Sequence, residues 1–219
     1  LCTGCQLQHI DYTYTLEMKR EIVVDAIVRV GGIANPLVMD TIASPNEYGY
    51  RNHARFTIGP EGSLGFVNRE SRQFVSVEQC LLMDDWINGA LEQLQGLCSE
   101  TTQLSVRYGI DTGEYLVQPT LKNENIPLAS GQKYYMDSLN GRAFRVASPS
   151  FFQVNIPQAG RMVEEVKNAL CLSGDELVVD VYAGVGTFAI MLAPHCRKVI
   201  AIEESRAAVD DARVNASGI

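Results

Sequence analysis

One glycine-rich stretch constrains the fold of this chain more than any other: residues 177–190, LVVDVYAGVGTFAI. An apolar run leads into two glycines, and apolar residues at helical spacing follow them. Glycines permit a tight turn and let backbone N–H groups approach a ligand closely. The helix that follows directs its positive N-terminal end to the same place. The pattern therefore predicts the first strand, loop and helix of a nucleotide-binding α/β domain.

The residues around this loop indicate which cofactor it binds. A second buried strand is expected at 198–202 and ends in Glu203, where such folds bind the two hydroxyls of a ribose. An adenosine-type cofactor follows from this. Asp180 lies inside the first strand, where a nicotinamide enzyme normally has an apolar residue, and so favours S-adenosyl-L-methionine. Its carboxylate either orients the loop or meets the cationic amino-acid moiety by a charge-assisted hydrogen bond. In the simplest alternative, Asp180 caps the loop and the glycines only turn the chain.

The motif lies unusually close to the end of the sequence at Ile219. Residues 177–219 have room for one strand–helix–strand–helix unit, whereas a doubly wound sheet needs several more strands. Half of such a sheet would leave an apolar strand edge uncovered. We therefore expect a truncated domain whose remainder lies outside this sequence.

Composition and charge restrict the class of protein. The chain has 219 residues, 46% of them hydrophobic and 20% charged, as is usual for a soluble globular protein. No apolar run approaches the roughly 20 residues that a membrane span needs. The formal net charge of −8, taken alone, argues against nucleic-acid binding. Four arginines in the stretch 51–72 leave two interpretations open, a local basic surface or scattered solvated side chains: Arg51, Arg55, Arg69 and Arg72.

The six cysteines show no secretory pattern, so disulfides are the weaker interpretation and a cytoplasmic protein is expected. Cys2-x-x-Cys5 is a short chelating pair, and Cys80 stands alone. Metal and iron–sulfur sites are built from such pairs together with distant partners. The remaining cysteines are expected to be small apolar core residues: Cys98, Cys171 and Cys196. The histidines show no metal-ligand spacing and are expected to be ordinary surface or core residues: His9, His53 and His195.

The rest of the sequence predicts regions that differ in fold class. A helix capped by Asp11 or Thr13 should run to about Val30, with one apolar stripe at helical spacing: Ile22, Val23, Ala26, Ile27 and Val30. Short alternating strands and turns, including the Asn140-Gly141 hairpin signal, predict a mostly antiparallel α+β module. A helix over about 157–170 then leads into the glycine motif, so the class changes to parallel α/β near residue 148.

Four stretches of the chain carry a more specific signal when taken in order: CTGCQLQH at 2–9, YRNHARF at 50–56, PSFFQVN at 149–155 and DVYAGVGTF at 180–188. Together they resemble the RNA uracil-5-methyltransferases, the family that methylates C5 of uridine in ribosomal and transfer RNA. The resemblance covers nearly the whole chain, and the first and third stretches are the specific ones. It implies a fold of the class α/β plus α+β. A central antiparallel α+β module precedes the first half of a Rossmann-like S-adenosylmethionine-dependent methyltransferase domain.

The resemblance also implies roles for individual residues. The cofactor S-adenosylmethionine would be bound by Gln153, Tyr182, Gly184, Gly186, Thr187 and Glu203. A [4Fe–4S] cluster would take its second, third and fourth ligands from Cys2, Cys5 and Cys80, with the first ligand before Cys2.

Three segments follow from the resemblance. Residues 1–39 would hold the cluster-ligand segment and a helix packed on the catalytic domain. Residues 40–147 would form the RNA-binding module, whose arginines guide the RNA by phosphate contacts. Residues 148–219 would be the N-terminal part of the truncated methyltransferase domain.

In the resembled family, a cysteine attacks C6 of a flipped uridine and a carboxylate base removes the C5 proton. Both are expected beyond residue 219, so no catalytic residue is assigned and the fragment itself should be inactive. Ribosomal or transfer RNA is the expected partner. Two alternatives remain: an RNA-binding or scaffold protein with a vestigial cofactor domain, and, less favoured, a nicotinamide-dependent oxidoreductase.

Overall fold

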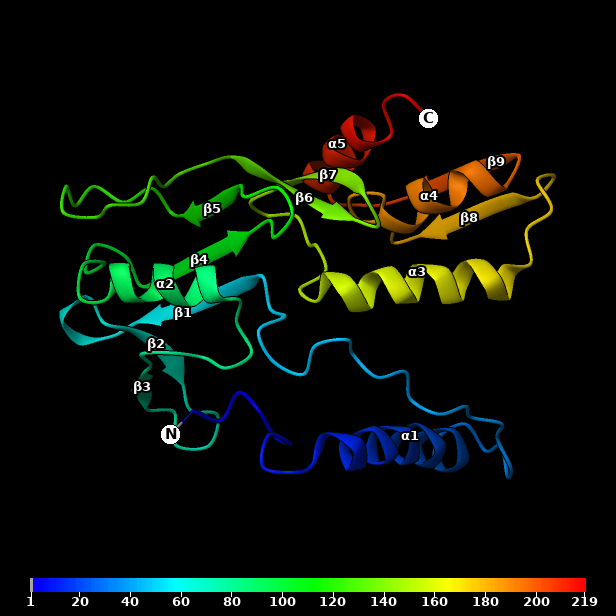
Figure 1. Ribbon diagram of the computed structural model, residues 1–219, viewed down its shortest axis with the longest axis horizontal. Coiled ribbons are helices and arrows are strands. Elements are labelled where there is room, and N and C mark those ends of the chain that lie inside the picture. Colours follow the sequence, from blue (N-terminus) through cyan, green and yellow to red (C-terminus); the bar gives the residue numbers. More distant parts are fainter. Residues whose placement is uncertain (1) are drawn as a thin grey trace.

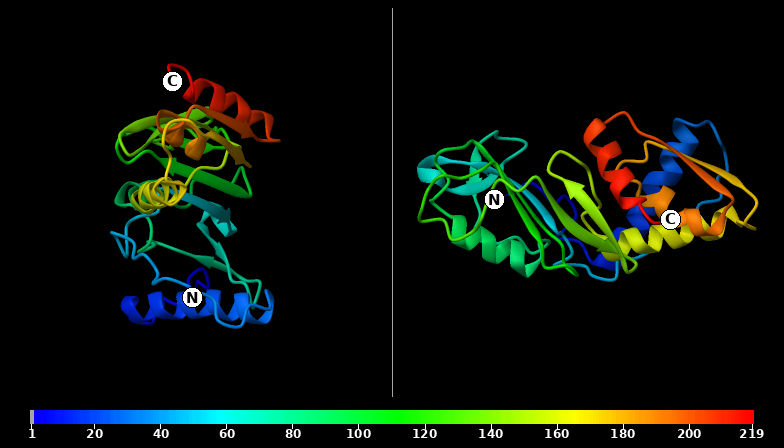
Figure 2. Two further views of the ribbon diagram at one scale, coloured as in Figure 1. Left: turned by 90° about the vertical axis from the view of Figure 1, so that its right-hand side faces the viewer. Right: turned by 90° about the horizontal axis from the view of Figure 1, so that it is seen from above.

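The computed structural model describes residues 2–219, which form two packed regions at opposite ends of the long axis (Figures 1 and 2). The elements in chain order are α1 (Tyr12–Arg29), β1 (His53–Ile58), η1 (Pro60–Gly62), β2 (Leu64–Val67), β3 (Phe74–Ser76), α2 (Asp85–Leu94), β4 (Gln103–Tyr108), β5 (Tyr115–Gln118), β6 (Tyr134–Leu139), β7 (Arg142–Ala147), α3 (Ile156–Leu170), β8 (Leu177–Val181), α4 (Thr187–Leu192), η2 (Ala193–His195), β9 (Lys198–Ile202) and α5 (Arg206–Asn215). Within the described part of the chain, no helix is both long and apolar enough to cross a membrane.

The first region is a five-stranded antiparallel sheet in the order β3-β2-β1-β4-β5, covered on one face by α2. Alternation along β1 buries Ala54 and Phe56 against the helix and leaves His53 and Arg55 on the other face. Asp84 begins α2 by accepting a hydrogen bond from the backbone N–H of Trp86. The sheet therefore has one apolar face, which makes the core, and one polar face.

The second region has its own core. The hairpin β6–β7 turns at Asn140-Gly141, both with positive φ as a two-residue turn requires. Its buried side chains pack with those of α3 and of the glycine loop: Tyr135, Leu139, Phe144, Val146, Phe152, Val163, Val185 and Ile190 belong to one cluster. The hairpin thus packs with the C-terminal region, and the division of the chain at 147/148 stays a prediction.

The parallel pair β8–β9 follows, in register from Leu177↔Lys198 to Val181↔Ile202. α5 then returns to the hairpin and lies along β7 (Figure 1). Its fully buried Asp211 accepts hydrogen bonds from Arg145 Nε at 2.8 Å, Ala147 N at 2.7 Å and Ser150 Oγ at 2.7 Å. One carboxylate therefore joins α5, β7 and the segment that leads to α3.

Replacing Asp211 with alanine should destabilise the fold, because it leaves three inward-facing donors without their acceptor. We expect a loss of about 2–4 kcal/mol in the free energy of unfolding, measured by urea denaturation. Asp210→Ala on the same helix removes an exposed carboxylate paired only with Arg213, and should cost less than about 0.5 kcal/mol. Equal losses in the two variants would contradict this role for Asp211.

The N-terminal helix α1 packs less than its pattern predicts. Asp11 caps it, as expected, by accepting from the N–H groups of Thr13 and Tyr14. Only Thr15 is buried, whereas Ile22 and Val23 on the predicted apolar stripe are exposed. The connection that follows α1 contacts α3, since Gln158 Nε2 donates to the carbonyl of Ile42. Packing of residues 1–39 on a catalytic domain stays a prediction.

Candidate cofactor site

The glycine loop leaves β8 and enters α4 through backbone conformations that glycine favours. φ is +57° at Gly184 and +87° at Gly186. A Cβ on Gly186 would lie 2.8 Å from Ile190 Cδ1, whereas a Cβ on Gly184 would meet nothing within 4 Å. Gly186 is therefore required by the packing beneath the loop, and Gly184 lies on its open side. The exposed Tyr182 and half-buried Thr187 flank the two glycines.

Asp180 holds the start of α4. The backbone N–H of Ala189 donates to its Oδ2 at 2.9 Å, and burial raises the pKa of this carboxyl. This bond fits two of the roles that the sequence left open, orienting the loop and capping it. Asp180 reaches the loop because of its place inside the strand, from which its side chain is directed at the turn that follows.

Glu203 meets the glycine loop from the end of β9. Its Oε2 accepts from the N–H of Gly184 at 2.8 Å, and its Oε1 accepts from the N–H of Ser205 at 2.8 Å. The bonds from Ser205 and Gly184 hold the pKa of Glu203 below its usual value, so the group is a carboxylate at neutral pH. This contact follows from the parallel pairing of β8 and β9, because the carboxyl ends of both strands lie at one edge.

Five of the six predicted cofactor residues therefore gather at one edge: Tyr182, Gly184, Gly186, Thr187 and Glu203. Gln153 comes from another segment, between β7 and α3, and is half-buried. Its neighbour Phe152 packs in the same core as Val185 and Ile190. This edge, with an open loop face and an anionic acceptor, fits an adenosine-type ligand. The individual contacts to the cofactor stay predictions.

Asn215 supports the glycine loop by hydrogen bonds, and no pattern in the sequence predicts this role. Its Nδ2 donates to the carbonyl of Val185 at 3.1 Å and to that of Arg145 at 3.0 Å. Its Oδ1 accepts from Arg145 N at 2.7 Å. The last turn of α5 thus ties the glycine loop to β7, a contact between segments 30 and 70 residues apart in sequence.

The predicted cluster ligands lie near one another. The pKa of the Cys5 thiol is raised by burial and then by its neighbours Cys80 and Cys2. Nevertheless, nowhere in residues 2–219 do three or more His, Cys, Asp or Glu side chains form a group that could hold a metal ion. Of the cysteines expected in the core, Cys98 is buried, with its pKa raised to about 11 by burial. The expectation is wrong for Cys171, which is exposed because it ends α3 in a left-handed conformation.

The four arginines come from two segments of the chain. Arg51 and Arg55 lie at the start of β1 and within it, and Arg51 Nε donates to the carbonyl of His53 at 2.9 Å. Arg69 and Arg72 lie in the turn between β2 and β3, where the backbone N–H of Arg69 donates to Thr3 Oγ1 at 2.8 Å.

A strand, a glycine loop, a helix and a terminal acid follow an antiparallel sheet, as the fold of an S-adenosylmethionine-dependent methyltransferase requires. A solved structure confirms the predicted fold class: Pyrococcus abyssi tRNA (uracil-54, C5)-methyltransferase in complex with S-adenosyl-L-homocysteine. It matches with a TM-score of 0.78 and 24% identity over 98% of this chain and 62% of that chain. Residues 128–218 match the family model described as tRNA (Uracil-5-)-methyltransferase. The resemblance that the four sequence stretches predict is thereby confirmed.

Curated relatives of the chain are named as RNA methyltransferases. An uncharacterized RNA methyltransferase of Synechocystis sp. is 29% identical over 273 residues, covering 98% of this chain and 58% of the relative. Another, from Staphylococcus aureus, is 24% identical over 271 residues, covering 99% of this chain and 60% of the relative. The chain thus spans about 60% of the length of the curated relatives it matches.

Proposed function

We propose that this chain is the central and cofactor-binding part of an enzyme that transfers a methyl group from S-adenosylmethionine to C5 of a uridine in structured RNA. The observation that carries the proposal is the glycine loop bound to Glu203 at the carboxyl edge of β8–β9. The match of residues 128–218 to the uracil-5 family supports the substrate class. Activity in the cytoplasm stays a prediction.

Each residue of the site has a defined part in this proposal. S-adenosylmethionine, when bound, supplies the methyl group on a sulfonium. Glu203, kept anionic by two backbone donors, offers acceptors to the ribose hydroxyls. The open side of Gly184 lets the backbone approach the ligand, and Asp180 keeps the loop in place through Ala189. Ordering of the loop before binding lowers the entropic cost of holding the cofactor.

None of the six cysteines in the chain is assigned as the nucleophile that attacks C6, so we propose that this chain alone binds the cofactor without methylating RNA. Half-exposed apolar side chains on one face of β8–β9 support the view that a further layer covers this face in the complete protein: Leu177, Val179, Val181 and Ile202. Cys2, Cys5 and Cys80 would ligate a [4Fe–4S] cluster there, which iron analysis of anaerobically purified protein would test.

The test supplies labelled S-adenosylmethionine and unmodified ribosomal or transfer RNA to the complete protein. Nucleoside mass spectrometry should then find 5-methyluridine in one of the two RNA classes. The isolated chain should bind S-adenosylhomocysteine in calorimetry and leave both RNAs unmodified. Methylation at another atom, or none by the complete protein, would contradict the proposal. Methyl transfer by the isolated chain would overturn the assignment of the nucleophile to another segment.

A further inference from the structure

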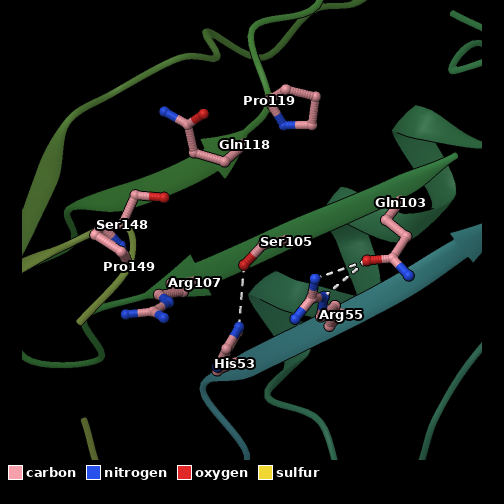
Figure 3. Close-up of a pocket in the computed structure, with 9 residues that line it drawn as sticks. All are labelled: His53, Arg55, Gln103, Ser105, Arg107, Gln118, Pro119, Ser148 and Pro149. Atoms are coloured by element: carbon pink, nitrogen blue, oxygen red, sulfur yellow. Dashed lines mark hydrogen bonds between the residues drawn. The ribbon is translucent and has the colours of Figure 1, made fainter. Parts of the chain in front are cut away.

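A polar pocket lies on the face of the central sheet opposite α2, well apart from the glycine loop in sequence. Its volume is about 460 Å³. Figure 3 shows side chains from three neighbouring strands and from the segment after β7 around it: His53, Arg55, Gln103, Ser105, Arg107, Gln118, Pro119, Ser148 and Pro149. We call this set the polar pocket.

The polar pocket is electropositive although the chain as a whole carries a formal charge of −8. Two guanidinium groups line it, and its nine lining residues include no carboxylate. The pKa of His53 is lowered to about 4, first by burial and then by the positive charges of Arg107, Arg51 and Arg55. The part of this lowering that comes from the three guanidinium groups reflects their positive charge, which favours an anion.

Arg107 carries the sharpest signal, because it is a buried cation with an unpaired donor. Its side chain is only 7% exposed, and its Nη1 donates to the carbonyl of Ser150 at 2.8 Å. Its Nε has no hydrogen-bond partner within residues 2–219, and no carboxylate in that range forms an ion pair with it. A buried guanidinium without a carboxylate partner keeps its positive charge uncancelled, and this charge favours an anionic ligand in the polar pocket that Arg107 lines.

The other polar groups suit the same kind of ligand. Arg55 donates from Nε and Nη2 to the neutral Oε1 of Gln103, at 3.1 and 2.7 Å, so its charge is not cancelled (Figure 3). His53 and Ser105 face each other at 3.0 Å and present a neutral hydrogen-bonding pair. Fixed guanidinium donors beside neutral hydroxyl and amide groups match a phosphate with an attached sugar.

We propose that the polar pocket binds a phosphodiester group of the RNA substrate, with Arg55 and Arg107 as the two charged contacts. This inference rests on the proposed function and names where on the central sheet the RNA is held. Ser148 and Pro149 on its wall belong to the segment that continues to Phe152, whose ring packs in the core beneath the glycine loop. RNA held here would thus lie against the same segment that borders the cofactor site.

The test measures the affinity of the complete protein for a substrate oligoribonucleotide by fluorescence anisotropy over a range of salt. Arg55→Gln should weaken binding on the order of 10-fold and reduce the slope of log Kd against log salt by about 1. Gln103→Glu should act similarly, because its carboxylate keeps the contact with Arg55 and cancels its charge. Arg29→Gln, an exposed charge on α1, is the matched control and should change Kd less than 2-fold.

RNA affinity, displacement by phosphate and affinity for the cofactor product together decide whether the proposal holds. Equal weakening by Arg29→Gln, or no weakening by Arg55→Gln and Gln103→Glu, overturns the proposal. Displacement of the RNA by micromolar inorganic phosphate would also overturn it, because the pocket would then serve a free anion. Affinity for S-adenosylhomocysteine should be unchanged in every variant. If the wild-type protein methylates RNA but Arg55→Gln and Gln103→Glu bind RNA as tightly as the wild type does, the pocket assignment fails while the proposed function stands.

Discussion

Replacing Glu203 with alanine should lower the affinity for S-adenosylhomocysteine on the order of 100-fold. The substitution removes the acceptor proposed for the ribose hydroxyls and also the bond that holds Gly184 N at 2.8 Å. The loop would then lose both its ligand contact and its tie to β9. Isothermal titration calorimetry on the wild type and the variant measures the change directly.

Two further variants serve as controls for this result. Glu203→Gln keeps one acceptor oxygen and should fall between wild type and alanine. Glu204→Ala changes the adjacent exposed acid, which has no bond to the loop, and should bind as the wild type does. An unchanged affinity in Glu203→Ala would mean that this acid is not part of the cofactor site. The pKa of Glu203 is lowered, so the carboxylate and its loop contact should persist as pH falls through the ordinary glutamate range.

Replacing Gly186 with valine should abolish detectable cofactor binding and destabilise the C-terminal region by about 2–4 kcal/mol. A φ of +87° is strained for any side chain, and the new Cβ would lie 2.8 Å from Ile190 Cδ1 and 3.4 Å from Ala212 Cβ. Relief requires the loop to move away from the core that positions it. Thermal denaturation and calorimetry with S-adenosylhomocysteine report the two effects separately.

The two loop glycines should respond differently to substitution, so Gly184 provides a control for the prediction on Gly186. Gly184→Ala places a methyl group on the open side, with no atom within 4 Å, so stability should fall by only about 1 kcal/mol while cofactor affinity falls. Gly141→Ala in the β6–β7 turn has a similar positive φ, open surroundings and no place in the loop. It should cost stability alone. A stability loss in Gly184→Ala as large as that in Gly186→Val would contradict the packing argument.

Much of the candidate site could be predicted from sequence because its rules are local. Two closely spaced glycines in a strand–loop–helix pattern require the turn that the structure shows. Parallel pairing of the next strand brings its terminal acid to the same edge, so Glu203 lies beside the glycine loop and accepts from Gly184 N. The carboxyl inside the strand, Asp180, was expected to orient the loop, to contact the cofactor or only to cap the loop, and its bond to Ala189 fits the first and the third of these.

Other residues carry no local signal, since their roles depend on segments far apart in the chain. Periodicity predicted an apolar stripe on α1, yet Ile22 and Val23 are exposed, because periodicity does not say whether a partner surface is present. His53 was expected to be an ordinary residue. Its position beside Arg107 is set by the register of β1 on β4, which pairs these two residues directly.

The sequence by itself determined the glycine loop, its flanking acids and the resemblance to the uracil-5-methyltransferases, because φ above zero, strand alternation and motif order are written along the chain. Only the tertiary structure decided that Asp211 and Asn215 of α5 secure the hairpin and the loop. It alone also placed Arg107 with an unpaired Nε in the wall of the polar pocket. Burial and hydrogen bonding between distant segments arise from the packing of whole elements, and no pattern of neighbouring residues records them.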